Sequence, residues 1–223
     1  MLGKRGFGNV YKGLLANSNE KFVVKRFKGG SNQGEKEYIY EINVISTLRH
    51  KNLVQLKGWC HENEELLLVY EFLPNRSLDF HLFGNNVNLT LPTRYNIAVD
   101  LANALHYLQD GCDPFVLHRE SIKSSNIMLD SNFNAKLRDF GLARLTQQDQ
   151  NFRTTAPAGT LGYLAPEVIS SGKVSKASGT FSYGVVALEL VSGKRPVNRS
   201  KELNLVEWVW ELYGEGSVLE AKD

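Results

Sequence analysis

The chain has 223 residues, 42% hydrophobic and 22% charged, the composition of an ordinary globular protein with room for two lobes. Its formal net charge of +2 and its lack of long blocks of like charge argue against a nucleic-acid-binding surface. The longest apolar run, at residues 66–70, is far shorter than a membrane span, so the sequence predicts no membrane segment.

Three glycines, Gly3, Gly6 and Gly8, lie close together near the start of the chain, and Val10 follows them. This spacing predicts a hairpin in which two strands flank a glycine-rich loop. Backbone N–H groups approach a phosphate closely only where no side chain intervenes, so the loop suits a phosphate-binding site. On these residues alone, an ordinary glycine-rich turn remains the alternative.

A β-branched strand at residues 22–25 ends in Lys25, and a lysine at a strand end is usually solvated. The segment after it predicts a helix, because apolar residues recur at helical spacing at Tyr38, Ile42, Ile45 and Leu48. Glu41 lies on the same inward face, where a carboxylate requires a cation. We therefore expect Lys25 and Glu41 to form an ion pair.

Two more strands are predicted at residues 53–60 and 65–71, with a polar turn between them. Pro74 ends the strand pattern, and Ser77 suits the N-cap position of a following helix. This stretch is a connector between two structural regions.

From residue 93 onward the apolar spacing becomes helical, with Gly111 at the end of the first helix. Residues 180–191 are almost wholly apolar and predict a buried helix. A strand-rich half followed by a helix-rich half indicates an α+β fold of two lobes. We place the N-lobe at residues 1–72 and the C-lobe at residues 73–223.

Two loops rich in charged and amide side chains lie at residues 118–126 and at Asp139-Phe140-Gly141. Each adjoins a short apolar run, which predicts polar groups delivered to one cleft. Asp139, followed by a glycine at a turn, suits a carboxylate that binds a metal. Polar residues 142–164 then lead to Ala165-Pro166-Glu167, a pattern typical of a functional lid.

In this order, the motifs resemble those of a eukaryotic protein kinase domain, over nearly the whole chain. Residues 53–60, 68–79 and 159–167 are similar to plant receptor-like serine/threonine kinases, the lectin-receptor group among them. The resemblance implies a bilobed fold that binds ATP and Mg²⁺ between its lobes and phosphorylates a protein substrate. It also implies a C-lobe truncated at its C-terminus, because a full kinase domain is longer.

The resemblance assigns roles to single residues. Those implied in nucleotide binding are Gly3, Gly6, Gly8, Val10, Lys25, Glu41, Tyr70, Glu71 and Leu73. Lys25, held by Glu41, would contact the α- and β-phosphates, with Tyr70 as the gatekeeper. Glu71 and Leu73 would bond adenine through their backbone. Those implied in metal binding and catalysis are Asn126 and Asp139 for the metal, Lys123 for the γ-phosphate and Glu120 for the base.

The loop at residues 118–126 is one residue longer than the family pattern, and no Asp occupies the base position. Aligned on His118, that position holds Glu120; aligned on Lys123, it holds Ser121. A serine hydroxyl is a poor base near pH 7, and glutamate reaches one methylene further than aspartate. Because about 1 Å of misplacement can cost on the order of 100-fold in rate, this difference bears directly on activity.

Three other positions depart from the family pattern. Arg5 stands where the second glycine of the loop belongs, Arg138 where a glycine is usual, and Gly179 where the family has an aspartate. Three interpretations therefore stay open: a working serine/threonine kinase, a pseudokinase that binds nucleotide and acts as a protein-interaction module, or a decayed product without a stable fold.

The two cysteines, Cys60 and Cys112, belong to no Cys-x-x-Cys pair, which argues against a zinc site and predicts reduced, buried thiols. Reduced thiols and the lack of an N-terminal signal segment indicate a cytoplasmic location. By the resemblance, this could be the cytoplasmic face of the plasma membrane, in a parent receptor whose membrane span lies outside the chain.

Overall fold

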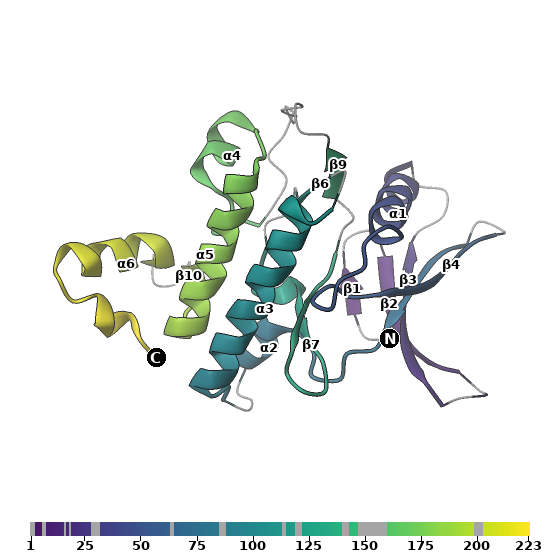
Figure 1. The fold of residues 1–223 in the computed structure, drawn as a ribbon, viewed down its shortest axis with the longest axis horizontal. Helices are drawn as coiled ribbons and strands as arrows, with labels where there is room; N and C mark the ends of the chain where they lie inside the picture. The colour runs from purple at the N-terminus through teal and green to yellow at the C-terminus, as the bar shows by residue number, and fades with distance from the viewer. Residues whose placement is uncertain are drawn as a thin grey trace.

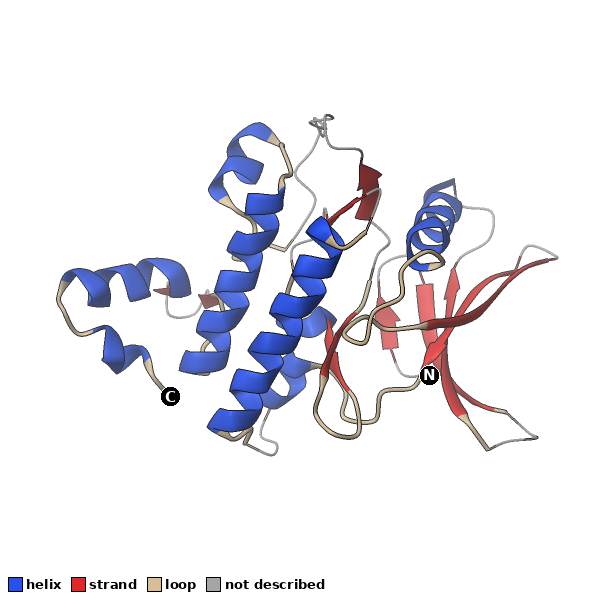
Figure 2. Cartoon of the chain, viewed as in Figure 1, coloured by secondary structure: helices blue, strands red, loops and turns tan. Residues whose placement is uncertain are grey.

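The computed structural model describes residues 3–5, 8–15, 17, 19–27, 32–62, 65–84, 88–112, 115–118, 122–139, 143–146, 160–198 and 203–223. A strand-rich part and a helix-rich part lie next to each other (Figures 1 and 2). Strand β5 (Glu65–Glu71) is followed by helix α2 (Leu78–Phe83), so the change from strands to helices falls between them. This is the predicted bilobed α+β fold, while the exact lobe boundary at residue 72 stays a prediction.

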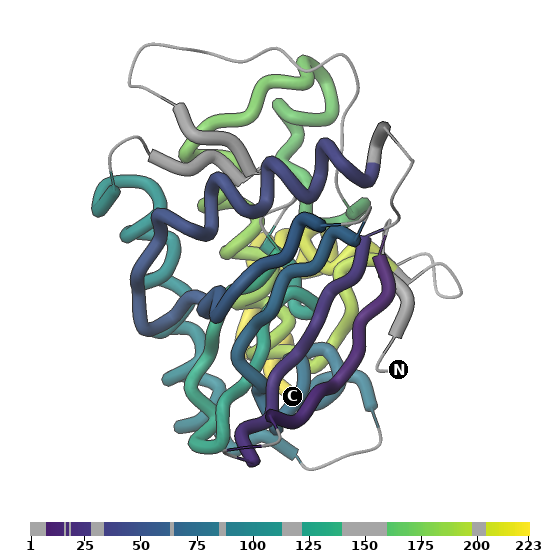
Figure 3. Tube along the Cα trace, turned by 90° about the vertical axis from the view of Figure 1, so that its right-hand side faces the viewer, coloured from purple at the N-terminus to yellow at the C-terminus, as the bar shows by residue number. Residues whose placement is uncertain are grey.

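Five antiparallel strands form the N-lobe sheet in the order β1-β2-β3-β5-β4. The remaining bounds are β1 (Gly3–Arg5), β2 (Gly8–Leu14), β3 (Lys21–Phe27) and β4 (Leu56–Glu62). Figure 3 shows β2, β3, β5 and β4 side by side, with helix α1 (Asn32–Ile45) next to them. Lys25 of β3 is paired with Val10 of β2 and Leu68 of β5, so the three side chains share one face of the sheet.

Helix α1 packs on the sheet through its predicted apolar face. Tyr38, 2% exposed, meets the ring of Phe27 edge-on at 5.6 Å between centroids, and Leu66 and Leu68 complete this cluster. Burial of these large side chains is worth roughly 1.5–3 kcal/mol each. Glu41 lies one turn after Tyr38 and is carried into the interior with it.

Strand β4 begins at Leu56, later than the predicted start at residue 53. Leu53 and Val54 pair instead with Leu137 of the C-lobe, through a bridge and through a bond from the Val54 N–H to the Leu137 carbonyl. The Asn52 amide adds a bond to the Ala135 carbonyl at 3.0 Å. Tertiary pairing thus overrides the local strand preference and fastens the two lobes together.

Two long helices, α3 (Leu91–Asp110) and α5 (Lys176–Ser192), run side by side through the C-lobe (Figure 1). Helix α3 begins after Thr90, whose hydroxyl accepts from the Thr93 N–H, and ends at Gly111 as predicted. Helix α5 begins four residues before the predicted start, because Ser175 and Ser178 form a capping box. Ser77 occupies the N-cap of α2, but its side chain makes no capping bond.

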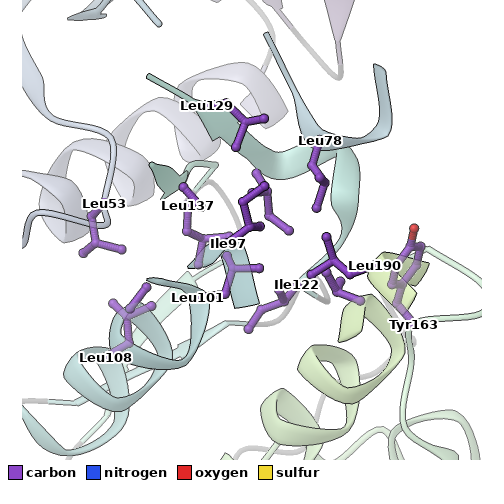
Figure 4. Close-up of a cluster of buried hydrophobic side chains, with 14 of the residues drawn as sticks. Leu53, Leu78, Ile97, Leu101, Leu108, Ile122, Leu129, Leu137, Tyr163 and Leu190 are labelled. Atoms are coloured by element: carbon purple, nitrogen blue, oxygen red, sulfur yellow. The ribbon is translucent and has the colours of Figure 1, made fainter. Parts of the chain in front are cut away.

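The main hydrophobic core lies where α3, α5 and a short hairpin meet (Figure 4). That hairpin consists of β7 (Ile127–Leu129) and β8 (Ala135–Leu137). The side chains labelled in the close-up are Leu53, Leu78, Ile97, Leu101, Leu108, Ile122, Leu129, Leu137, Tyr163 and Leu190. Because both strands of the hairpin pack into this core, Asn126 and Arg138, which flank its open end, are held in place.

The other elements are short. They are β6 (Phe115–His118) paired with β9 (Ala143–Thr146), η1 (Ser124–Asn126), α4 (Pro166–Ser171), β10 (Val197–Asn198) paired with β11 (Leu203–Asn204), α6 (Leu205–Gly214) and η2 (Val218–Ala221). In the part of the chain that the structure describes, no helix has the length and apolar character needed to cross a membrane.

Both cysteines are free thiols, as predicted, but they are half-buried and not fully buried. Cys60 lies on β4, one of the two edge strands of the sheet, and on its outer side β4 pairs with no strand among the described residues. Cys112 lies just beyond the end of α3 and donates to the Leu108 carbonyl.

Candidate functional site

A cleft of about 610 Å³ lies between the N-lobe sheet and the C-lobe hairpin. Its lining includes Val10 and Lys25 from the sheet, Glu41 from α1, Leu73 from the connector, and Met128 and Asp139 from the C-lobe. A cavity of this size and mixed lining suits a small organic ligand with charged groups.

Lys25 is the central cation of this cleft. Its Nζ lies 2.7 Å from Glu41 Oε2 and 3.7 Å from Asp139 Oδ1, which confirms the predicted pairing with Glu41. Burial alone would lower the pKa of Lys25, but the charges of Glu41 and Asp139 more than offset it and raise that pKa above its ordinary value. The lysine therefore stays protonated throughout the neutral range.

Glu41 is held from two sides. Besides its bond from Lys25, the Glu41 carboxylate accepts a hydrogen bond from the Tyr70 hydroxyl, with the oxygens 2.5 Å apart. Burial, followed by the nearby Glu41 charge, raises the pKa of Tyr70 well above its ordinary value, so Tyr70 remains a donor. The three side chains come from β3, α1 and β5, so this contact joins the helix to the sheet at the cleft wall.

Asp139 adopts a left-handed backbone conformation, with a φ of 74°. Such a conformation costs about 1 kcal/mol or more in a residue other than glycine and is concentrated at functional sites. The Asp139 side chain is 30% exposed, and its carboxylate faces Lys25. Asp139 is therefore directed into the cleft and not into solvent outside it.

Asn126 is 1% exposed, and neither polar atom of its side-chain amide has a hydrogen-bond partner among the described residues. Its backbone carbonyl accepts from the Arg138 N–H at 3.0 Å, which aligns it with the residue before Asp139. A buried amide without a partner is costly, and such a group is typical of a site that a ligand completes. The bond from the Arg138 N–H brings the backbone of Asn126 close to that of Asp139 at the open end of the hairpin, while metal binding by the two residues stays a prediction.

Glu71 makes contacts that were not foreseen. Its carboxylate pairs with Lys136 Nζ of β8 at 2.9 Å and accepts from the Gln55 N–H at 2.9 Å. The side chain therefore ties the end of β5 to the C-lobe hairpin. The Glu71 N–H donates to the Gln55 carbonyl at 3.2 Å, so a backbone contact from Glu71 to a ligand, which stays a prediction, would use its carbonyl. Leu73 nearby is 7% exposed.

The glycines have a structural requirement of their own. A side chain at Gly8 would place its Cβ 2.9 Å from the Arg26 carbonyl oxygen, so the pairing of β2 with β3 needs a glycine there. Gly3 pairs with Val10 across β1 and β2. Gly6 and Glu120 lie outside the described residues, as do Ser121, Phe140 and Gly141.

A second polar cluster, which sequence reasoning missed, lies below the cleft in the C-lobe. Glu189 of α5 is fully buried, and its Oε1 accepts from the Tyr163 hydroxyl at 2.7 Å and from the Ser124 hydroxyl at 3.2 Å. The signal was a lone glutamate within the apolar helix predicted at residues 180–191. The cluster holds Ser124, the residue next to Lys123, whose Nζ donates to Thr160 at 3.0 Å.

Comparisons with known proteins agree with this geometry. A model of the protein kinase domain family matches residues 1–211. Over the whole chain, the sequence is 52% identical to L-type lectin-domain containing receptor kinase IX.1 and 51% identical to probable L-type lectin-domain containing receptor kinase S.7, both of Arabidopsis thaliana. Over 95% of the chain it is 47% identical to proline-rich receptor-like protein kinase PERK4 of the same plant.

The chain spans only about a third of the length of these relatives, 35%, 34% and 34% respectively. The matched region nevertheless includes every described cleft residue discussed above. The chain belongs to the protein kinase domain family and is similar to plant receptor-like kinases over essentially its whole length.

Proposed function

We propose that the cleft binds ATP with Mg²⁺ and that the chain transfers the γ-phosphate to serine or threonine hydroxyls of a protein substrate. The observation that carries this proposal is the cluster of Lys25, Glu41 and Asp139 on the wall of the cleft. A protonated lysine held by one buried carboxylate and facing a second, more exposed one suits a polyphosphate bound with a cation.

The phosphate end of the nucleotide would lie against Lys25, whose ammonium group is oriented by Glu41. The other end would lie between Val10 and Leu73, with the Glu71 and Leu73 backbone as adenine partners and Tyr70 as gatekeeper. Gly3, Gly6 and Gly8 would cover the phosphates from the glycine-rich loop. Of these residues, those that line one continuous cleft are Val10, Lys25, Glu41, Tyr70, Glu71 and Leu73.

The residues present fit a metal ion. The Asp139 carboxylate and the unpartnered Asn126 amide supply oxygen ligands, which Mg²⁺ prefers, and phosphate oxygens and water complete such sites. When bound, Mg²⁺ would neutralise part of the phosphate charge. Among the described residues, no group of three His, Cys, Asp or Glu could hold a metal. The proposed ion therefore depends on the nucleotide for part of its coordination.

For phosphate transfer, Lys123 would contact the γ-phosphate and Glu120 would accept the proton of the attacking hydroxyl. Such transfer depends mainly on positioning and charge stabilisation, so a displaced base leaves some rate. The extra residue and the missing aspartate in this loop favour a second candidate function. In that function, the chain is a pseudokinase that binds nucleotide and works as a protein-interaction module.

The cellular setting is inferred from relatives named as receptor kinases. We infer that the chain is the kinase part of a membrane receptor, located at the cytoplasmic face of the plasma membrane. Its partner there would be a protein substrate.

Transfer of radiolabelled phosphate from ATP to a basic protein, or to the chain itself, tests the kinase proposal. The control is Lys25→Met, and label above this control supports a working kinase. A second variant replaces Glu120 and Ser121 by a single Asp. No label in the wild type but strong label in this variant would favour the pseudokinase, with the loop alone responsible. No label in either would reject phosphate transfer.

A further inference from the structure

We propose that Lys136 is a positioning residue for the base of the nucleotide. Through its ion pair with Glu71, it sets the direction of the Glu71 backbone carbonyl, so that this carbonyl accepts a hydrogen bond from the amino group of adenine. The inference rests on the nucleotide-binding function proposed above and concerns how the site selects its base. Lys136 is not among the residues that line the cleft, and no predicted site residue or proposed role includes it.

Lys136 extends from the floor of the cleft. It is paired with Met128 across β7 and β8, and the residues on either side of both are buried in the C-lobe core. Because side chains alternate between the two faces of a hairpin, Lys136 and Met128 share the face opposite the core. Met128 lines the cleft, so this face forms part of the cleft floor.

Glu71 is fixed from two directions. The Lys136 ammonium group contacts both oxygens of the Glu71 carboxylate, at 2.9 Å and 3.1 Å. The two side chains are only 15% and 20% exposed, so the pair is largely shielded from water, unlike the surface pairs that contribute little. Gln55 bonds to Glu71 in both directions, since its carbonyl accepts from the Glu71 N–H and its own N–H donates to the Glu71 carboxylate. Together these bonds fix the rotation of Glu71 about the strand and its height above the floor, and with them the direction of its carbonyl.

The pair lies at the base end of the cleft and not at the phosphate end. Lys25 is paired with Leu68 of β5, and Glu71 follows Leu68 by three residues. At the rise of a β-strand, these two positions are about 10 Å apart along β5. Loss of the pair is therefore expected to weaken recognition of the base and to leave the contacts of Lys25 with phosphate intact.

The chemistry links the ion pair to the carbonyl. A carbonyl accepts a useful hydrogen bond from an amino group only when both the distance and the angle are favourable. Without Lys136, the half-buried Glu71 carboxylate would lose its cation and would have to move toward water, because an unpaired buried charge is costly. The Glu71 backbone would shift with its side chain, and the bond to the base would weaken.

The test compares ATP with purine riboside triphosphate, which has the same ribose and triphosphate but lacks the amino group of adenine. Calorimetry in Mg²⁺ measures both dissociation constants. In the wild type, we expect ATP to bind about fivefold more tightly, the value of one neutral hydrogen bond. In Lys136→Met, we expect the affinity for ATP to fall about fivefold, while that for purine riboside triphosphate changes by less than about twofold.

Two further variants separate positioning from a general structural role. Lys136→Arg keeps the ion pair and should retain the preference for ATP. Glu71→Gln keeps an acceptor for the Gln55 N–H but removes the charge, so it should lose the same preference as Lys136→Met. The double variant Lys136→Met with Glu71→Gln should lose no more than either single variant, because both act through one contact.

A matched control is Arg26→Gln. Arg26 is the neighbour of Lys25 on β3, but its side chain is 52% exposed and pairs with Glu65, and neither Arg26 nor Glu65 lines the cleft. This control also breaks a pair between a cation and a glutamate, and it should leave both affinities unchanged. Thermal unfolding of each variant checks that it is folded, and if Lys136→Met is not, Glu71→Gln decides the question.

Three results would overturn this inference alone: equal binding of the two ligands by the wild type, an unchanged preference for ATP in Lys136→Met and Glu71→Gln, or an equal loss of affinity for both ligands in these variants. No binding of ATP by the wild type would overturn the proposed function, and this inference with it.

Discussion

Two buried glutamates in this molecule illustrate two ways of placing a carboxylic acid inside a protein. Glu41 in the N-lobe is 2% exposed and Glu189 in the C-lobe is 0% exposed. Each accepts a hydrogen bond from a tyrosine hydroxyl. Tyr70 donates to Glu41 at 2.5 Å, and Tyr163 donates to Glu189 at 2.7 Å. Only Glu41 has a cation, Lys25, within salt-bridge distance in the described part of the chain.

This difference decides the protonation of Glu189. Burial raises the pKa of Glu189 to about 7, although the hydrogen bonds from Tyr163 and Ser124 counteract part of the rise. Below neutral pH the group is therefore a neutral acid that joins α5 to Ser124. At Glu41, by contrast, the lysine charge is kept at the cleft wall. The fold thus maintains the Lys25–Glu41 ion pair at the cleft, where a charged ligand is proposed to bind. In the interior of the C-lobe, Glu189 instead forms a largely neutral hydrogen-bond network.

The largest expected effect follows from removing the cation of the first cluster. Lys25→Met leaves the Glu41 carboxylate buried without its partner, so we expect the free energy of unfolding to fall by about 4 kcal/mol. Urea unfolding measured at pH 7.5 checks this value.

The control for this prediction is the double variant Lys25→Met with Glu41→Gln, in which no uncompensated charge remains. It should recover most of the stability lost in the single variant. A loss below about 1 kcal/mol in Lys25→Met, with no recovery in the double variant, would contradict the view that the pair compensates a buried charge.

The second prediction concerns the pH dependence produced by Glu189. Its folded pKa of about 7 lies above the ordinary glutamate value of 4.5, so between these pH values the folded state holds a proton that the unfolded state has lost. The contribution of Glu189 to stability therefore decreases as pH rises from 4.5 to 7. Glu189→Gln removes this decrease, and at pH 8 we expect it to be more stable than the wild type by on the order of 2 kcal/mol.

Urea unfolding of both proteins at pH 5, 6, 7 and 8 tests this prediction. The stability difference between variant and wild type should grow in favour of Glu189→Gln up to about pH 7 and then level off. A difference that stays constant across this range would show that Glu189 is ionised in the folded state throughout.

The smallest effects come from the two tyrosines, which form a matched pair. At pH 6, Tyr70→Phe removes a hydrogen bond to a carboxylate paired with lysine, and we expect a loss of about 2 kcal/mol. Tyr163→Phe removes a hydrogen bond to a largely protonated acid, with an expected loss of about 1 kcal/mol. Thermal unfolding of both variants measures the ranking, and the reverse order would undo the distinction between the two clusters.

The sequence was most informative where one element determines its own environment. The apolar residues at helical spacing predicted an amphipathic helix, and they are Ile97, Leu101, Ala104, Leu105 and Leu108. In α3 all of them are buried except Leu105, which is half-buried and packs against the core. The ion pair of Lys25 with Glu41 followed from a carboxylate on a buried helix face, which needs a cation.

The sequence was least informative where distant segments meet. Ser124, Tyr163 and Glu189 come from three separate elements, and none of them alone indicates a shared network. Leu53 has strand-like neighbours, yet it pairs with Leu137 of the other lobe, which only the tertiary structure reveals. The position of Arg138 could be noted from the sequence, but its bond to the Ser125 carbonyl could not.

Binding of ATP with Mg²⁺, measured by thermal unfolding, tests the central claim most directly, with Arg26→Gln as the control outside the cleft. At a ligand concentration 100 times the dissociation constant, binding stabilises the folded state by roughly 2.7 kcal/mol, which raises the Tm by roughly 5 to 10 °C. We predict this shift in the wild type and in Arg26→Gln, and its loss in Lys25→Met. No shift in the wild type, or an equal shift in Lys25→Met, would contradict a nucleotide site built on Lys25, Glu41 and Asp139.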